Sequence, residues 1–307
     1  MAAAVLPIPS PLRRRLEETH ARMLQPDPGR AIDFASPAGE PAMAAPDSVS
    51  WQVFKNPLTL FVGGVAAVIL ELAEPRVRAG VWDHSSFRRD PLGRLQRTGL
   101  AAMVQVYGPR GAAERMIAGV VRAHERVRGV ASTGEAYAAN DPDLLDWVFA
   151  TATWGFGAAY HAYARTLTAA ELDALNAEGL EAGRLYGALG APASHAELQA
   201  MLAGWTPRLE PSDVLDEFLS IMRDRPLLPL GGQMLQPLLV KAAIGLVPTD
   251  LRAQLRLGRR WDLRPWERLL VRQAAKAADR LMLRSSPAVQ ASLRLGLPAD
   301  WLYRRDR

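Results

Sequence analysis

Apolar residues recur at three- and four-residue spacing through most of the chain beyond residue 50, in runs rich in Ala, Leu and Arg. This spacing is typical of amphipathic helices, whereas half-buried strands alternate apolar and polar positions. The sequence contains no convincing alternating stretch and no internal repeat. The pattern therefore predicts an all-α fold, with roughly eight to twelve helices at typical helix lengths.

Capping signals mark several expected helix starts. Asp141 is followed by a proline, which is well tolerated in the first helical turn because its missing N–H is not needed there. Thr168 with Glu171, and Ser194 with Glu197, have the spacing of capping boxes. We expect helices to begin at these three points.

The first 50 residues differ in composition from the remainder. They are rich in Ala and Pro and predict a short helix at 12–24, followed by an extended segment that wraps around the body of the protein. Beyond residue 50 no stretch has the composition of a linker. We therefore predict an N-terminal region, 1–50, and a single all-α domain, 51–307.

Neither of the two most apolar regions predicts a transmembrane helix. The run Leu58 to Leu70 has 13 residues, whereas a bilayer span needs about 20. The region 226–248 is interrupted by prolines and by Lys241. The arginines at 13–15 are not followed by the apolar stretch of a secretory signal. We expect buried helices in a cytoplasmic protein, and the sequence leaves open a peripheral membrane contact.

Composition narrows the possible chemistry. With no cysteine, disulfides, iron–sulfur clusters, thiolate-bound zinc, thiolate-ligated haem and a cysteine nucleophile are excluded. Lys and Arg number 37 against 32 Asp and Glu, for a net charge of +5, and the excess is strongest after residue 250. These basic residues are spread at helical intervals, which is typical of a solvated face. We therefore expect no nucleic-acid partner.

Common catalytic motifs are missing. There is no phosphate-binding loop, no nucleophile elbow and no dinucleotide fingerprint after a strand. His124 and Glu125 resemble the start of a zinc-hydrolase motif, but Arg128 occupies the position of its second histidine. Nucleotide binding, zinc hydrolysis and serine hydrolysis are therefore disfavoured.

His124 is the histidine that stands out from the pattern. At 100° per residue it shares one face of the expected helix 113–128 with Ile117, Val120 and Val121. A lone histidine on an apolar face is most often a structural residue bonded to a backbone carbonyl. The same position also fits an axial haem ligand, because that role requires a neutral imidazole on a rigid helix in an apolar cavity. Arg128, one turn further on, could then pair with a haem propionate.

Four ordered sequence blocks resemble a known family. They are Val81-Trp-Asp-His-Ser-Ser-Phe87 continuing through Asp90-Pro-x-x-Arg-x-x-Arg-Thr98; Val121-Arg-Ala-His-Glu-Arg-Val-Arg-Gly129; Tyr137-x-Ala-Asn-Asp-Pro-Asp-Leu-Leu-x-Trp-Val-Phe-Ala-Thr151; and Ala159-Tyr160 with Leu167-Thr-x-x-Glu171. The chain is similar to the bacterial and fungal oxygenases that include latex clearing protein and the MpaB-type enzymes. This resemblance implies an all-helical enzyme that binds haem b through one histidine and cleaves isoprenoid double bonds with dioxygen.

The resemblance also assigns expected roles to individual residues. His124 matches the haem ligand, and Arg94 and Thr98 match residues beside the distal face. Arg97 stands where latex clearing protein has a lysine able to cap the iron, although arginine is a poor ligand because it stays charged. From pattern alone, the stripe that contains these three residues is typical of a solvated face. His84 is expected in a loop lining the haem or substrate cavity, and Arg128 near a propionate.

Two positions depart from the family pattern. Many relatives have histidine where this chain has Phe149, and often also where it has Glu74. These differences suggest a distal pocket of different polarity.

The leading hypothesis is a haem-dependent oxygenase that acts with dioxygen on a small apolar substrate. The alternatives are a non-oxygenase haem protein (peroxidase-like, carrier or sensor) and a haem-free binding module.

Overall fold

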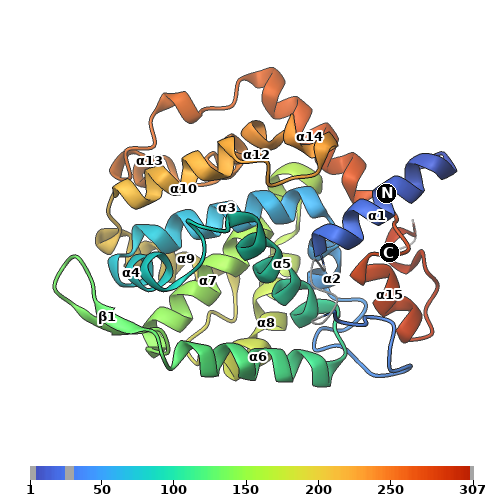
Figure 1. Ribbon diagram of the computed structural model, residues 1–307, viewed down its shortest axis with the longest axis horizontal. Helices are drawn as coiled ribbons and strands as arrows, with labels where there is room; N and C mark the ends of the chain where they lie inside the picture. Colours follow the sequence, from blue (N-terminus) through green and yellow to red (C-terminus); the bar gives the residue numbers. More distant parts are fainter. Residues whose placement is uncertain (1–4, 25–30, 305–307) are drawn as a thin grey trace.

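The computed structural model describes residues 5–24 and 31–304, and α-helices dominate it (Figure 1). The helices of its first half are Ser10–Leu24 (α1), Val49–Phe54 (α2), Pro57–Ala73 (α3), Pro75–His84 (α4), Pro91–Tyr107 (α5), Arg110–His124 (α6) and Pro142–Ala159 (α7). Those of its second half are Ala169–Tyr186 (α8), His195–Trp205 (α9), Asp213–Asp224 (α10), Leu230–Gln233 (α11), Gln236–Ile244 (α12), Thr249–Gln254 (α13), Pro265–Asp279 (α14) and Pro287–Arg294 (α15). The all-α prediction is confirmed, and the described helices exceed the expected eight to twelve because several are single turns.

Helix α3 forms the centre of the molecule. In Figure 1, α10, α12 and α14 lie on one side of it and α7, α8 and α6 on the other. The closest packing is between α3 and α7, where a Cβ atom on Gly63 would lie 2.6 Å from the carbonyl oxygen of Gly155. Only glycine permits two helix backbones to approach this closely. Gly155, in α7, therefore has a packing role.

The predicted helix starts agree with the structure. Thr168 and Glu171 form a reciprocal capping box at the start of α8. Ser194 accepts a hydrogen bond from the backbone N–H of Glu197 at the start of α9. α7 begins directly after Asp141, whose side chain does not cap the helix but accepts a hydrogen bond from the N–H of Ala138. The apolar run predicted to form a buried helix is the core of α3.

The N-terminal segment wraps against the C-terminal part of the chain, as expected for its described residues. The buried guanidinium of Arg294, in α15, donates hydrogen bonds to the carbonyl oxygens of Phe34 (2.7 Å) and Glu40 (2.8 Å). The indole N–H of Trp301 donates to the carbonyl oxygen of Pro46 at 3.0 Å. Part of the expected extended segment, residues 25–30, lies outside the described residues. The division into regions 1–50 and 51–307 remains a prediction.

The sequence pattern missed one element, a β-hairpin. Strand Arg128–Val130 (β1) pairs antiparallel with Ala136–Ala138 (β2). Helix α6 therefore ends at His124, four residues before the expected end. Strands of three residues are too short to show an alternating pattern, which explains why periodicity did not reveal them.

Candidate functional site

The candidate site lies where α3, α5, α6 and α7 approach one another. Each helix has a local signal that fixes where it begins. Asp90 caps α5 by accepting a hydrogen bond from the N–H of Gly93 at 2.9 Å, and Pro91 follows in the first turn. α6 begins after Pro109 and buries Ala113 and Ile117. With these starts fixed, helical periodicity sets which side chains face the interior.

His124 is the last residue of α6 and is half-buried. Burial lowers the pKa of its imidazole, the charge of Arg94 lowers it further, and the neighbouring Asn140 side chain acts in the opposite direction. The imidazole is therefore kept neutral near pH 7, which is the protonation state that can bind a metal.

One buried nitrogen of the imidazole and one buried oxygen of Asn140 lack a hydrogen-bond partner. Among the described residues, neither Nδ1 of His124 nor Oδ1 of Asn140 has a partner that meets hydrogen-bond geometry. The Asn140 amide is held in place because its Nδ2 donates to the carbonyl oxygen of Val121 at 3.2 Å. Unsatisfied buried polar atoms are uncommon and call for an explanation. A small rotation that joins the Nδ1–H to Oδ1 would leave Nε2 as the free lone pair.

Glu71 and Arg94 form the charged part of the site. Burial raises the pKa of Glu71 to about 7, against the lowering effects of Arg94 and of a hydrogen bond from Thr151. The Thr151 hydroxyl lies 3.4 Å from Oε1 of Glu71. Burial is also the main cause of a lowered pKa for Arg94, with Glu71 raising that pKa and Arg97 lowering it. Near neutral pH, Glu71 can therefore hold or release a proton beside a guanidinium.

The N–H donors of the Arg94 guanidinium are unpaired in the described structure. It forms no hydrogen bond or ion pair with any residue in the described part of the chain. Thr98 lies one turn further along α5, and it is exposed. Side chains four residues apart on a helix are neighbours, so one ligand can contact both. The structure thus brings Arg94 toward His124 and Glu71 and leaves Thr98 at the outer end of the same stripe.

The other predicted site residues lie further out. Arg97 is exposed, and its guanidinium contacts Asp90 (3.4 Å) and the hydroxyl of Ser86 (2.6 Å). Arg128 begins strand β1, is exposed, and donates to the carbonyl oxygen of Glu125 at 3.0 Å. His84 is exposed and ends α4, so it lies on a helix terminus and not in the expected loop. None of the three forms a hydrogen bond or ion pair with the His124 cluster in the described structure, and Arg97 acts on it only through its charge, which lowers the pKa of Arg94.

The two departures from the family pattern have structural roles. Glu74 is buried and caps α4, accepting a hydrogen bond from the N–H of Val77 at 2.7 Å and pairing with Arg76 at 3.0 Å. Phe149 packs on α8, where a Cβ atom on Gly179 would lie 3.1 Å from its ring. Because both positions are occupied by packing or capping contacts, neither supplies a polar group to the Glu71–Arg94 cluster.

The remaining histidines are not part of the site. His161 accepts a hydrogen bond through Nδ1 from the N–H of Leu167 at 3.1 Å, which is a structural role. His195 is half-exposed at the start of α9. His20, expected on the surface, is half-buried instead; burial lowers its pKa, and its Nδ1 also lacks a partner among the described residues, but neither Arg94 nor Asn140 acts on it. Within residues 5–24 and 31–304, no group of three or more His, Asp or Glu side chains is arranged to hold a metal ion.

Sequence reasoning missed two residues of the cluster, Glu71 and Asn140. Glu71 directly follows the apolar run Leu58 to Leu70 and ends it. A carboxylate inside a core helix is itself a signal, because buried acids require a partner or a function. Asn140 lies between β2 and α7, where asparagine is common for reasons of turn geometry.

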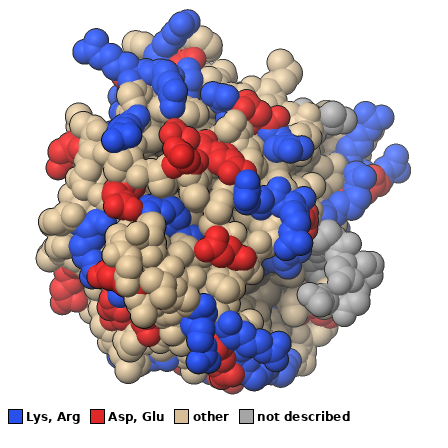
Figure 2. Space-filling model, turned by 60° about the vertical axis from the view of Figure 1, so that its left-hand side comes forward, with Lys and Arg blue, Asp and Glu red and all other residues tan. Residues whose placement is uncertain are grey.

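The surface gives no sign of a one-sided charge pattern on the face that Figure 2 presents. Basic and acidic side chains are interspersed there, with uncharged surface between them.

Among the described helices, none is individually long and apolar enough to cross a bilayer. Helices α3 and α4 together are long and apolar enough, but the chain bends by 110° between them.

Comparison with protein families gives an independent assignment. Residues 51–280 match the family model described as ER-bound oxygenase mpaB/B'/rubber oxygenase, catalytic domain. Searches of curated proteins and of solved structures gave no match. The matched range includes His124, Glu71, Arg94 and Asn140 and covers most of the chain. The chain therefore belongs to the mpaB/rubber oxygenase catalytic-domain family.

Proposed function

We propose that this protein is a haem b-dependent oxygenase that uses dioxygen on an apolar, alkene-containing substrate, with His124 as the iron ligand. The family membership supports oxygenase chemistry in general. The observation that carries the haem assignment is the neutral, half-buried imidazole of His124 with the charge of Arg94 and the unsatisfied amide oxygen of Asn140 beside it. A single axial histidine is sufficient to hold a haem.

The residues around His124 fit that role. Metal-bound histidines usually donate their second N–H to a carbonyl or carboxylate oxygen, which fixes the ring orientation and the tautomer. Oδ1 of Asn140 is the available acceptor, because the same amide is anchored through Nδ2 to Val121. We assign Asn140 as a positioning residue that would orient the imidazole and leave Nε2 free to bind the iron.

Arg94 and Glu71 supply the polar part of the proposed pocket. When bound, the haem supplies the redox chemistry with dioxygen, and the protein controls access and polarity. Arg94 has guanidinium N–H groups that no described residue occupies, so it can donate hydrogen bonds to oxygen atoms that gain negative charge. Glu71, with a pKa of about 7, can hold or release a proton at its carboxyl oxygens near neutral pH.

The test starts from an absorption spectrum of the purified protein after addition of haem. A Soret band with a haem b signature is expected. Dioxygen consumption is then measured with an isoprenoid alkene, squalene, and with its saturated analogue, squalane. We expect consumption and carbonyl products with squalene only. A Soret band without alkene-dependent consumption would favour the carrier, sensor or peroxidase-like alternatives, and no haem binding at all would refute the proposal.

A further inference from the structure

Helix α14 exposes an unusual row of large apolar side chains. Trp266, Leu269 and Leu270 are 57%, 58% and 41% exposed, respectively. Their spacing of three and four residues places them on one stripe of the helix. We call these three residues the apolar row. The helix lies at an outer edge of the molecule in Figure 1.

The exposure of the apolar row does not come from a poorly packed helix. The opposite stripe of α14 is buried through Val271, Ala275 and Ala278. Glu267 accepts a hydrogen bond from the N–H of Arg264 at 2.7 Å and pairs with Lys241 at 3.2 Å. The helix is therefore firmly seated, and the apolar row points away from the core.

A basic row runs along one side of the same helix. Arg268, Arg272 and Lys276 follow at four-residue spacing, and all three are exposed. None of them forms an ion pair with another residue that the structure describes. The acids of α14 face inward, since Glu267 is buried and Asp279 pairs with Lys55 at 3.4 Å. The positive charge of the basic row is thus not neutralised by its own helix.

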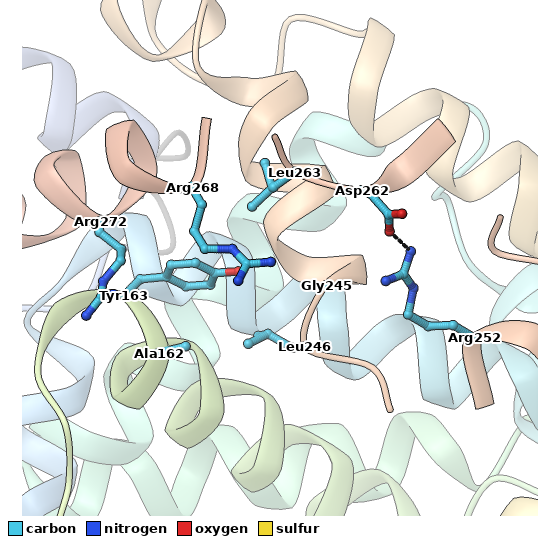
Figure 3. A pocket seen from close by; sticks show the side chains of 9 residues that line it. All are labelled: Ala162, Tyr163, Gly245, Leu246, Arg252, Asp262, Leu263, Arg268 and Arg272. Atoms are coloured by element: carbon cyan, nitrogen blue, oxygen red, sulfur yellow. Dashed lines mark hydrogen bonds and ion pairs between the residues drawn. The ribbon is translucent and has the colours of Figure 1, made fainter. Parts of the chain in front are cut away.

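A cavity of about 470 Å³ opens beside the basic row (Figure 3). It shares no residue with the His124 cluster. Arg268 and Arg272 reach it from α14, and Arg252 reaches it from α13 but is paired with Asp262 at 2.5 Å. The remaining lining is mainly apolar: Ala162, Tyr163, Gly245, Leu246 and Leu263. An apolar wall with two unpaired guanidinium groups suits a ligand that has an anionic head and an apolar body.

We propose that α14 is a docking surface for a membrane that contains anionic phospholipids. The apolar row enters the boundary between headgroups and acyl chains, where tryptophan and leucine are favoured. The basic row lies at the level of the headgroup phosphates, and the cavity receives one headgroup between Arg268 and Arg272. This arrangement reproduces the two parts of interfacial binding, apolar burial and attraction to anionic lipid.

Charge complementarity favours a lipid surface over a second copy of the chain. A two-fold dimer brings the same patch of both copies together, so the basic rows would face each other with no acid of α14 available to neutralise them. An anionic membrane supplies the opposite charge along the whole row. The proposal does not depend on the oxygenase assignment.

The experiment measures sedimentation of the full chain with vesicles of phosphatidylcholine alone and with vesicles that also contain phosphatidylglycerol. We expect binding only to the anionic vesicles, and weaker binding as salt screens the charges. Each basic side chain near an anionic surface contributes about fivefold to the binding constant, so Arg268→Gln with Arg272→Gln should weaken binding about 25-fold. Leu269→Ser with Leu270→Ser should weaken it by about tenfold or more.

A matched control is available on α8, a helix that packs with α6, α7 and α9. There Arg184 and Leu185 are also exposed, and Arg184→Gln with Leu185→Ser should leave vesicle binding unchanged. All substituted positions are exposed, and circular dichroism confirms that each variant is folded.

Three results would overturn the proposal. The first is binding to neutral and anionic vesicles alike. The second is binding that the arginine pair reduces but the leucine pair does not, which would indicate electrostatic attraction alone. The third is a leucine variant that binds vesicles normally but changes from dimer to monomer in analytical ultracentrifugation, which would assign the apolar row to a second copy of the chain.

Discussion

Arg94 and Arg97 lie three residues apart on α5, but their surroundings are very different. Arg94 is half-buried beside Glu71 and His124, its guanidinium has no described partner, and burial lowers its pKa. Arg97 is 49% exposed and is already engaged by Asp90 and Ser86. The same residue type on the same helix therefore has free donors in one place and satisfied donors in the other.

This difference shows where charge can act chemically. A guanidinium in water gains little from one more hydrogen bond, because water already solvates it and screens it. A guanidinium held in a partly dry site stabilises negative charge much more strongly. We therefore propose that Arg94 takes part in the chemistry, and we regard Arg97 as a surface residue.

The largest effect within this comparison is expected for Arg94→Ala. The variant should fold and bind haem but lose about a hundred- to a thousand-fold in turnover, as is typical when one preorganised donor is removed. The pKa of Glu71 should rise above about 7, because Arg94 lowers it in the wild type. Steady-state oxygen consumption measures the loss of turnover. Turnover within about twofold of wild type, against that hundred-fold expectation, would remove Arg94 from the site.

Asn140→Ala extends the comparison to the residue that would orient the proposed haem ligand. Loss of a partner that orients a metal ligand typically weakens metal binding about 10- to 100-fold. We expect haem affinity to fall in this range and the Soret maximum to shift. Asn140→Asp restores the acceptor oxygen but not the Nδ2 donor that anchors the side chain to Val121, so it should restore only part of the affinity. Haem titration measures both. An alanine variant with normal affinity and spectrum would make Asn140 a structural residue of the α6–α7 connection only.

Glu71→Gln sharpens the role of the carboxyl group beside Arg94. In the folded protein, burial raises the pKa of Glu71 from its ordinary value of 4.5 to about 7. The folded state therefore retains a proton between about pH 4.5 and 7 that the unfolded state releases, so this group lowers stability as pH rises through that window. In denaturant unfolding, the stability of the glutamine variant should no longer fall between about pH 4.5 and 7. Its activity, measured against pH, should also lack the ionisation near pH 7. Identical profiles for the two proteins would contradict a raised pKa.

The smallest effect is expected for Arg97→Gln. An exposed ion pair contributes about 0–1 kcal/mol to stability, and Arg97 has no described contact with the His124 cluster. We expect turnover within about twofold of wild type and a small shift in the midpoint of unfolding. A loss comparable to that of Arg94→Ala would show that both arginines act in the pocket and that their different burial is irrelevant.

Helical periodicity predicted much of the fold but only part of the site. The apolar run that forms α3 and the capping box at Thr168 can be predicted from the sequence, because both depend only on the spacing of nearby residues. The inward face of His124 also followed from spacing. The hairpin between α6 and α7 did not, since its strands have only three residues each.

The contacts within the cluster could not be predicted from spacing. The charge of Arg94, on α5, acts on Glu71, on α3, and a pattern within one helix does not encode how two helices are placed in space. Arg94 and Arg97 belong to one polar stripe, so periodicity assigns them the same environment. Only the neighbouring helices, which cover one end of the stripe, make Arg94 half-buried and leave Arg97 exposed.

The central proposal is that His124 holds a haem, and one spectroscopic comparison tests it most directly. Wild type, His124→Ala, His20→Ala and His195→Ala are purified, reconstituted with haem under identical conditions, and compared by absorption spectrum, with circular dichroism as the folding control. We expect a Soret band in wild type and in the two control variants, and its loss in His124→Ala. Full haem content and an unchanged spectrum in a folded His124→Ala protein would contradict it.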